Sequence, residues 1–340
     1  MWHIHHLAPL QEERQLAVTL YLRWSTYALL CVLGVMIPAV FAAKPLRVVT
    51  TVSPITDMAQ QVGGSAIQLH GMVPEGVNSH TFQPTPRDVR YLAEADVIIL
   101  NGLYLEITTE KLARRSGKEG VRILKLGDQT LHKSGWVYDF SFPKDQGHPN
   151  PHLWLNVKHA MHYVTLMRDA LSHFDRANQS VYHDNSERYL RQLSQLDACI
   201  ASAVDTIPPA HRKLLTYHDS WPYFARRYGM KVIGAVQPAS FSEPSARDVA
   251  RMIDQIRQSA VPAIFGSEVF PSKVLEKIAA EANVQYIKSL RDDDLPGVPG
   301  APEHSYLGMM RANVHTMVSA LGGDPAAFEA CSATFLAKKE

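Results

Sequence analysis

A single long amphipathic segment near the middle of the chain limits the folds that are open to it. Between residues 179 and 207, apolar side chains recur every three or four positions, and Pro208-Pro209 ends the pattern. This period predicts an α-helix about 40 Å long, at 1.5 Å per residue. Because a helix of that length can cross a whole domain, we interpret residues 179–207 as a linker helix between two lobes.

The segments on both sides of the predicted linker alternate between strand and helix patterns. The first half contains the runs LRVVTTVSPI, IQLHGMV and DVIILNG, which are apolar and β-branched in the manner of strands buried on both faces. The second half repeats the rhythm with KLLTYHDSW, MKVIGAV, VPAIFGSEVF and VQYIKSL. Strands that alternate with helices build parallel sheets. We therefore predict an α/β fold with two parallel-sheet lobes, residues 43–178 and 208–340, joined by the single long helix.

The N-terminal segment has the pattern of an export signal. Arg23 precedes an apolar run, residues 26–43, that is short for a membrane span. Val40 and Ala42 satisfy the small-residue rule of signal peptidase. We expect residues 1–42 to be a signal peptide and the mature protein to be periplasmic or extracellular.

The charge balance argues against a nucleic-acid partner. The 34 Lys and Arg residues nearly balance the 33 Asp and Glu residues, and the formal net charge is +1. Binding to a phosphate backbone requires a basic face, which this balance does not favour. We expect no nucleic acid among the partners.

Two cysteines remain after removal of the signal peptide. Cys199 and Cys331 are separated by more than a hundred residues, and in an oxidising compartment such a pair can form a disulfide. Two buried thiols are equally compatible with the sequence. The pairing is therefore left open at this point.

Three histidines occupy equivalent positions in the predicted fold. His80 lies in the loop EGVNSHTFQPTP after a strand, His152 lies in NPHLWLNV at a helix entrance, and His218 follows a strand in TYHDSW. Ligands gather where loops leave the carboxyl ends of parallel strands, and imidazole is a common zinc ligand. Sequence spacing alone leaves open whether the three rings meet at one metal ion or lie apart in surface turns.

The local strings NSHTFQPTP, NPHLWLNV, TYHDSWPYFARRYG, EPSARDVARMIDQIR and AIFGSEVF, in this order, resemble the metal-binding receptors of ABC importers for zinc and manganese. The resemblance covers nearly the whole mature chain. It implies a metal held in the cleft between two lobes, with the first three ligands at His80, His152 and His218. Asn78 and Asn150 stand where this family usually has aspartate, and we expect both to shape their loops.

The resemblance also implies a function. Such a receptor captures a divalent metal ion and delivers it to the permease of an ABC importer in the membrane. Imidazole-rich sites favour zinc over manganese, so we expect Zn²⁺ as the transported ligand, with Mn²⁺ less favoured. We expect a monomer without enzymatic activity.

The sequence departs from the family at the fourth ligand. In QYIKSLRDDDLPG, the position of the family's aspartate is taken by Lys288, and a charged ammonium group has no lone pair to donate. The available carboxylates are Glu268, Asp292, Asp293 and Asp294, and water is a further candidate. We select Glu268 as the fourth candidate ligand. We expect Lys288 to point outward and to pair with an acidic neighbour such as Asp292.

Two other functions are compatible with the three histidines. A zinc hydrolase also uses three histidines and an open water position, although no HExxH motif is present and Glu268 is the sole candidate base. A metal-binding adhesin or buffer without transport is the second alternative. A neighbouring permease and ATPase in the genome would distinguish a transport receptor from the latter.

Overall fold

Two parallel sheets form the framework of the protein. The computed structural model describes residues 44–237, 239–240, 244–270 and 272–336, so the predicted signal peptide lies outside the described residues. The first sheet has the strand order β2-β1-β3-β4 and the second has the order β6-β5-β7-β8. All pairings between neighbouring strands are parallel. The predicted fold class, with two parallel-sheet α/β lobes, is confirmed.

The strands are β1 (Leu46–Thr50), β2 (Ile67–Gly71), β3 (Val97–Leu100), β4 (Arg122–Lys125), β5 (Lys213–Thr216), β6 (Lys231–Ala235), β7 (Ala263–Ser267) and β8 (Gln285–Leu290). The α-helices are α2 (Ser53–Gly63), α3 (Pro86–Glu94), α4 (Ile107–Ser116), α5 (Leu126–Thr130), α6 (Val157–Phe174), α7 (Gln179–Asp205), α8 (Pro222–Arg227), α9 (Ala246–Ser259), α10 (Lys273–Ala282), α11 (Tyr306–Ala320) and α12 (Pro325–Leu336). Short 3-10 turns lie between them, including η4 (Leu153–Leu155).

Most predicted elements are present, with one strand shorter than expected. The run 46–55 is not a strand throughout: β1 ends at Thr50, and α2 begins at Ser53 with Pro54 in its first turn. Proline is favoured in the first turn of a helix, where its missing N–H costs no hydrogen bond. Helices α4, α5, α8 and α12 and strand β4 were not predicted from the sequence.

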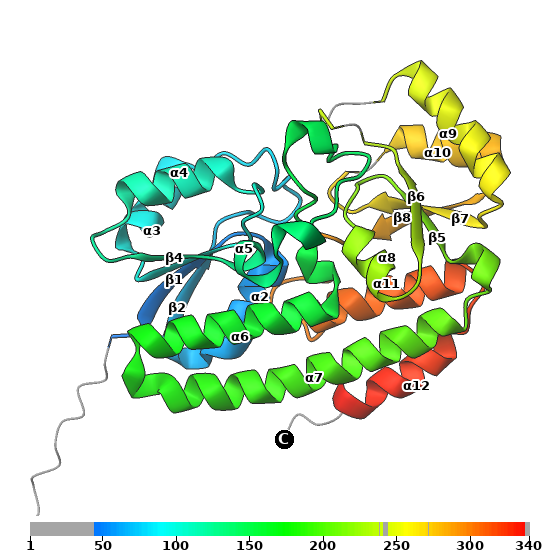
Figure 1. Cartoon of the computed structure of the whole chain (residues 1–340). Helices are drawn as coiled ribbons and strands as arrows, with labels where there is room; N and C mark the ends of the chain where they lie inside the picture. Colours follow the sequence, from blue (N-terminus) through cyan, green and yellow to red (C-terminus); the bar gives the residue numbers. More distant parts are fainter. Residues whose placement is uncertain (1–43, 238, 241–243, 271, 337–340) are drawn as a thin grey trace, which may run out of the picture. The chain divides into compact units, whose positions relative to one another are not determined.

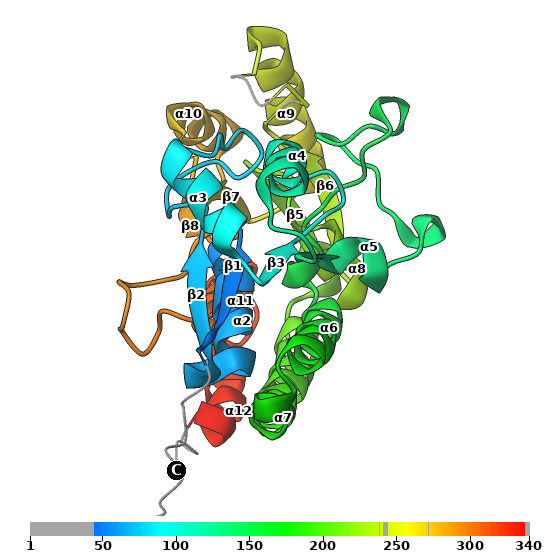
Figure 2. The same ribbon diagram turned by 90° about the vertical axis from the view of Figure 1, so that its left-hand side faces the viewer.

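The long amphipathic segment folds as helix α7. It ends three residues before Pro208, close to the predicted limit of the helical pattern. Figure 1 shows α7 running beneath both sheets, and α6 and α7 lie side by side in both views (Figures 1 and 2). Within the described part of the chain, no helix combines the length and the apolar character needed to cross a bilayer.

One hydrophobic core extends through both halves of the chain. It includes Val48 of β1, Tyr163 of α6, Leu193 of α7, Val314 of α11 and Phe328 of α12. Close packing of this kind resists relative displacement of the elements that share it. From Pro45 onward the chain accordingly forms one compact unit.

A disulfide ties the last described helix to α7. Cys199 of α7 is bonded to Cys331 of α12, and their Cα atoms lie 5.7 Å apart. This distance is typical of disulfides. The structure thus decides between the two alternatives that the sequence left open, and it favours the bridge over two free thiols.

Candidate metal centre

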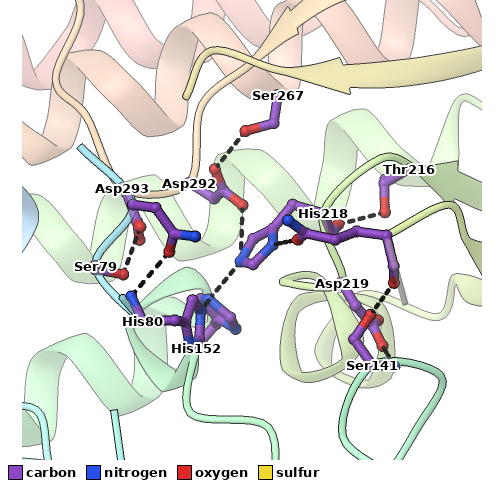
Figure 3. Close-up of polar contacts among 12 residues, drawn as sticks. Ser79, His80, Ser141, His152, Thr216, His218, Asp219, Ser267, Asp292 and Asp293 are labelled. Atoms are coloured by element: carbon purple, nitrogen blue, oxygen red, sulfur yellow. Dashed lines mark hydrogen bonds and ion pairs between the residues drawn. The ribbon is translucent and has the colours of Figure 1, made fainter. Parts of the chain in front are cut away.

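The three loop histidines come together in space. The Nε2 atom of His152 lies 3.3 Å from Nε2 of His80 and 3.0 Å from Nε2 of His218. The ligand atoms of all three residues lie within 4.8 Å of one another, and this is the group of potential metal ligands found among the described residues. Figure 3 shows the three rings pointing toward one another from different segments. Three nitrogen lone pairs can therefore reach one small cation.

Asparagine side chains shape two of these loops, as expected. The backbone N–H of His80 donates to Oδ1 of Asn78 at 2.9 Å, and that of His152 donates to Oδ1 of Asn150 at 3.1 Å. Both are turns in which an asparagine bonds the backbone two residues further on. The Asn150 amide group also donates to the carbonyl oxygen of Asp219 at 2.6 Å. These bonds fix the backbone from which the histidine side chains project.

Hydrogen bonds at the other ring nitrogen set the tautomers of two histidines. Nδ1 of His152 lies 2.8 Å from Oδ1 of Asn150, and Nδ1 of His218 lies 2.5 Å from Oε1 of Gln237. With these oxygens as acceptors, Nδ1 carries the proton and Nε2 keeps its lone pair. Metal-binding histidines usually donate their second nitrogen in this way, which also orients the ring.

His80 and His152 are held in the neutral form that a metal ion requires. Burial lowers the pKa of His152 well below the usual imidazole value, and the nearby rings of His218 and His80 lower it further. Burial, and then His218, lower the pKa of His80 in the same way. A cationic imidazole cannot coordinate, so a depressed pKa favours the binding-competent form.

Aromatic rings pack against the histidines. His152 and His218 are buried, and His80 is half-buried. The Phe142 ring centre lies 5.5 Å from that of His80, and the Trp154 ring lies 5.1 Å from that of His152. A cavity of about 170 Å³ reaches His80 from the outside. Solvent thus approaches the cluster on the His80 side, while the remaining surroundings exclude water and strengthen electrostatic interactions.

Three consecutive carboxylates, residues 292–294, form an acidic loop beside the histidines. Oδ2 of Asp292 lies 3.8 Å from Nε2 of His218, and both side chains are about 1% exposed. Oδ2 of Asp292 makes no hydrogen bond within the described part of the chain. Asp293 accepts a hydrogen bond from the Ser79 hydroxyl at 2.7 Å (Figure 3). A solvated acidic turn is thereby excluded, because these carboxylates are buried.

Glu268, the fourth ligand suggested by the sequence, is not a member of the histidine group among the described residues. Its Oε1 atom accepts hydrogen bonds from the backbone N–H groups of Asp292, Asp293 and Asp294, at 3.0, 3.1 and 2.9 Å. Burial raises the pKa of Glu268 to about 8, with a further contribution from the Asp292 charge. Its carboxylate is engaged by the acidic loop.

Lys288 points away from the candidate site. Its side chain is 75% exposed, and its Nζ atom lies 3.3 Å from Oε1 of Glu276 on α10. The expected outward orientation and the expected pairing with an acidic residue are both present, and the partner is Glu276 instead of Asp292. Asp292 is buried beside His218, whereas Lys288 is exposed. Lys288 therefore does not oppose a cation in the site.

Sequence reasoning missed the residues that support the histidines through Nδ1. Gln237 lies just after β6, in a stretch without any motif, and only the fold brings it to His218. Asn150 could be recognised as a loop former, but its bond to the ring of His152 could not. One sequence signal could have pointed to Gln237: it is a polar residue just after a strand, where ligand-binding groups of parallel sheets gather.

Comparison with known proteins agrees with this geometry. Residues 48–320 match the family described as zinc-uptake complex component A periplasmic, ZnuA. The zinc-binding protein TroA of Treponema pallidum is 30% identical over 282 residues, which cover 82% of this chain and 89% of TroA. The solved structure of TroA covers 82% of this chain and 99% of its own, with a TM-score of 0.74 and 28% identity.

Relatives named for other metals are nearly as similar. The iron-binding protein YfeA of Yersinia pestis is 29% identical, with 82% of this chain and 88% of YfeA covered. The manganese-binding lipoprotein MntA of Halalkalibacterium halodurans is 28% identical, with 81% and 88% covered. The match to the ZnuA family includes both sheets and the residues that form the histidine cluster. The chain therefore belongs to the ZnuA family, the metal-binding substrate-binding proteins of ABC importers, which are receptors and not enzymes.

Proposed function

We propose that this receptor captures zinc outside the cytoplasm and delivers it to the permease of an ABC importer. The observation that carries this proposal is the convergence of three Nε2 atoms, on His80, His152 and His218, within 4.8 Å of one another. Zinc prefers few ligands in a tetrahedral arrangement and binds imidazole well, whereas manganese prefers more oxygen ligands. TroA, named as a zinc-binding protein, further supports zinc over the iron and manganese of other relatives.

For the fourth position we propose the Asp292 carboxylate in place of Glu268. Oδ2 of Asp292 lies 3.8 Å from Nε2 of His218 and makes no hydrogen bond within the described residues. A buried acceptor without a donor is costly, and a cation at this place would satisfy it. Oε1 of Glu268, in contrast, already accepts three hydrogen bonds.

The choice of metal is tested by titrating the purified, chelator-treated mature protein with Zn²⁺ and with Mn²⁺ in competition with a fluorescent chelator. We expect one zinc ion per protein and an affinity at least about 100-fold higher than that for manganese, which corresponds to about 2.7 kcal/mol. Equal or tighter binding of manganese would reject zinc as the transported ion.

We also propose that residues 43–178 and 208–340 act as two lobes around the linker 179–207 and move little relative to each other. The continuous core through α7 supports restricted motion. Scattering curves of the metal-free and zinc-loaded protein should then give nearly equal radii. A large contraction on zinc binding would contradict the restricted motion of the two lobes.

The remaining proposals concern location and assembly. Export with removal of residues 1–42 predicts a mature protein that begins at Ala43, which N-terminal sequencing of the secreted protein would check. A monomer is expected to sediment as a single species near the mass of one chain. A full-length cytoplasmic product or a dimer would contradict the respective proposal.

A further inference from the structure

Glu268 makes an unusual set of contacts at the edge of the second sheet. It follows the last residue of β7 and lies next to the acidic loop, which follows the neighbouring strand β8. One carboxylate oxygen accepts three consecutive backbone N–H groups of this loop, at 2.9–3.1 Å. Successive N–H groups that point at one oxygen form a concave nest, and the acceptor holds their backbone in that shape. Glu268 therefore fixes the backbone of three residues at once.

The shape of the acidic loop decides where its carboxylates lie. The three side chains go to three different targets, which are Nε2 of His218 for Asp292, the hydroxyl of Ser79 for Asp293 and the backbone N–H of Gly76 for Asp294. The last two targets belong to the loop that carries His80. The loop thus reaches both sides of the histidine cluster.

The Glu268 side chain is placed at an electrostatic cost. Burial and the nearby Asp292 carboxylate both raise the pKa of Glu268. Like charges this close destabilise the metal-free protein. Removing the oxygen would leave three buried N–H groups without this acceptor, and an unsatisfied buried donor costs about 1–3 kcal/mol. The contacts therefore favour one loop conformation over others that would relieve the repulsion.

We propose that Glu268 is a positioning residue, which holds the acidic loop so that Asp292 faces His218 and thereby raises the affinity for the metal ion without coordinating it. This inference rests on the proposed function, because it presumes that an ion binds at the histidine cluster. The positioning role and the ligand role suggested by the sequence predict different results for Glu268→Gln. A positioning residue keeps its function in this variant, whereas a ligand loses it.

The test compares Glu268→Ala and Glu268→Gln in the mature protein, with Glu276→Ala as a matched control. Glu276 is a glutamate of the same half of the chain, and its contact is an exposed pair with Lys288. Zinc affinity is measured by chelator competition, and the absorption spectrum of the Co²⁺-loaded protein reports the coordination geometry.

We expect Glu268→Ala to lower zinc affinity by about 10–100-fold, as is usual for residues that support a metal ligand. The visible Co²⁺ bands should change as well, because the carboxylate ligand is displaced. Glu268→Gln should retain most of the affinity and the wild-type bands, since its amide oxygen can still accept the N–H groups. The control should bind both ions as the wild type does.

Three results would overturn the inference. If Glu268→Ala lowers the melting temperature but keeps the wild-type affinity and Co²⁺ spectrum, the residue is only structural. If Glu268→Gln loses as much affinity as His152→Ala, the residue is a ligand. If the wild-type protein binds neither ion, the proposed function itself fails, and the wild-type titration identifies that case. Should Glu268→Ala fail to fold, Glu268→Asp withdraws the oxygen from the amides while keeping the charge, and wild-type affinity in that variant rejects the inference.

Discussion

The two sides of the metal centre differ in how they are prepared for a cation. On the histidine side, the rings are buried or half-buried and in contact with one another, and burial lowers the pKa of His80 and His152, which favours their neutral form. On the carboxylate side, burial raises the pKa of Asp292 to about 7, with a further contribution from the Asp293 charge, and burial raises the pKa of Asp293 to about 6. His80 and His152 are ready to bind at neutral pH, whereas Asp292, with a pKa of about 7, still carries a proton in part of the molecules.

This difference suggests a division of roles between the two sides. Neutral imidazoles can lie against each other without charge repulsion, so the histidine side is assembled before the ion arrives. The carboxylates supply the negative charge that compensates the ion, and crowding them without a cation is unfavourable. We therefore expect the histidines to provide most of the affinity and the acidic loop to tune it.

The largest effect is expected from His152→Ala, which removes the central ring of the cluster. Zinc affinity should fall by at least about 100-fold, because loss of a supporting residue alone costs about 10–100-fold. Chelator competition measures the change. His162→Ala, a change at an exposed position of α6, is the control and should bind zinc normally. Wild-type zinc affinity in His152→Ala would show that the histidines do not provide most of the affinity.

A smaller loss is expected from Asp292→Asn, which keeps the size of the side chain but removes its charge. The affinity for zinc should fall by about tenfold or more, since an amide oxygen is a weaker partner for a cation than a carboxylate. The exposed Asp254 of α9 provides the control, Asp254→Asn. If Asp292→Asn binds zinc as the wild type does while Asp293→Asn does not, the fourth ligand is the neighbouring carboxylate.

The pH dependence of binding separates the two sides directly. Because a raised pKa keeps part of Asp292 and Asp293 protonated near neutrality, falling pH should weaken zinc binding already between about pH 7 and 5, well above the ordinary aspartate pKa near 3.9. The lowered pKa of His80 and His152 delays their protonation to lower pH. Each proton that zinc displaces lowers the zinc affinity by at most about tenfold for each unit by which the pH falls.

Calorimetry in buffers of different ionisation enthalpy counts the released protons. Asp292→Asn should show a flatter profile than the wild type in this range. An identical profile in the variant would mean that the imidazoles, and not the carboxylates, determine the pH dependence.

Sequence reasoning predicted the histidine side more completely than the carboxylate side. His80 and His218 follow strands and His152 lies at a helix entrance, positions where ligands gather in α/β folds. Their spacing left open whether the rings meet, and the resemblance to metal receptors implied that they do. The acidic loop was assigned less well, because Lys288 was aligned with the family's aspartate although Asp292 and Asp293 follow within a few residues. Whether a carboxylate after a strand faces solvent or the cluster depends on the contacts of Glu268 with three amides, and no sequence pattern encodes those contacts.

The smallest effect is expected at Lys288. Its side chain is exposed and paired with Glu276, so Lys288→Asp should leave zinc affinity within about twofold of the wild type, in contrast to a lysine that opposed the ion. The same chelator competition measures this, with Lys277→Asp on α10 as a control for the change in net charge. A tenfold gain in zinc affinity in Lys288→Asp but not in the control would show that residue 288 stands at the fourth ligand position.

X-ray absorption at the zinc edge of the loaded protein tests the central claim, that three imidazoles hold the ion. We expect three nitrogen ligands with imidazole multiple scattering at about 2.0–2.1 Å and one oxygen at about 2.0–2.2 Å. His152→Ala should lose one imidazole from this pattern. A first shell made mainly of oxygen, or one that is unchanged in His152→Ala, would contradict the claim.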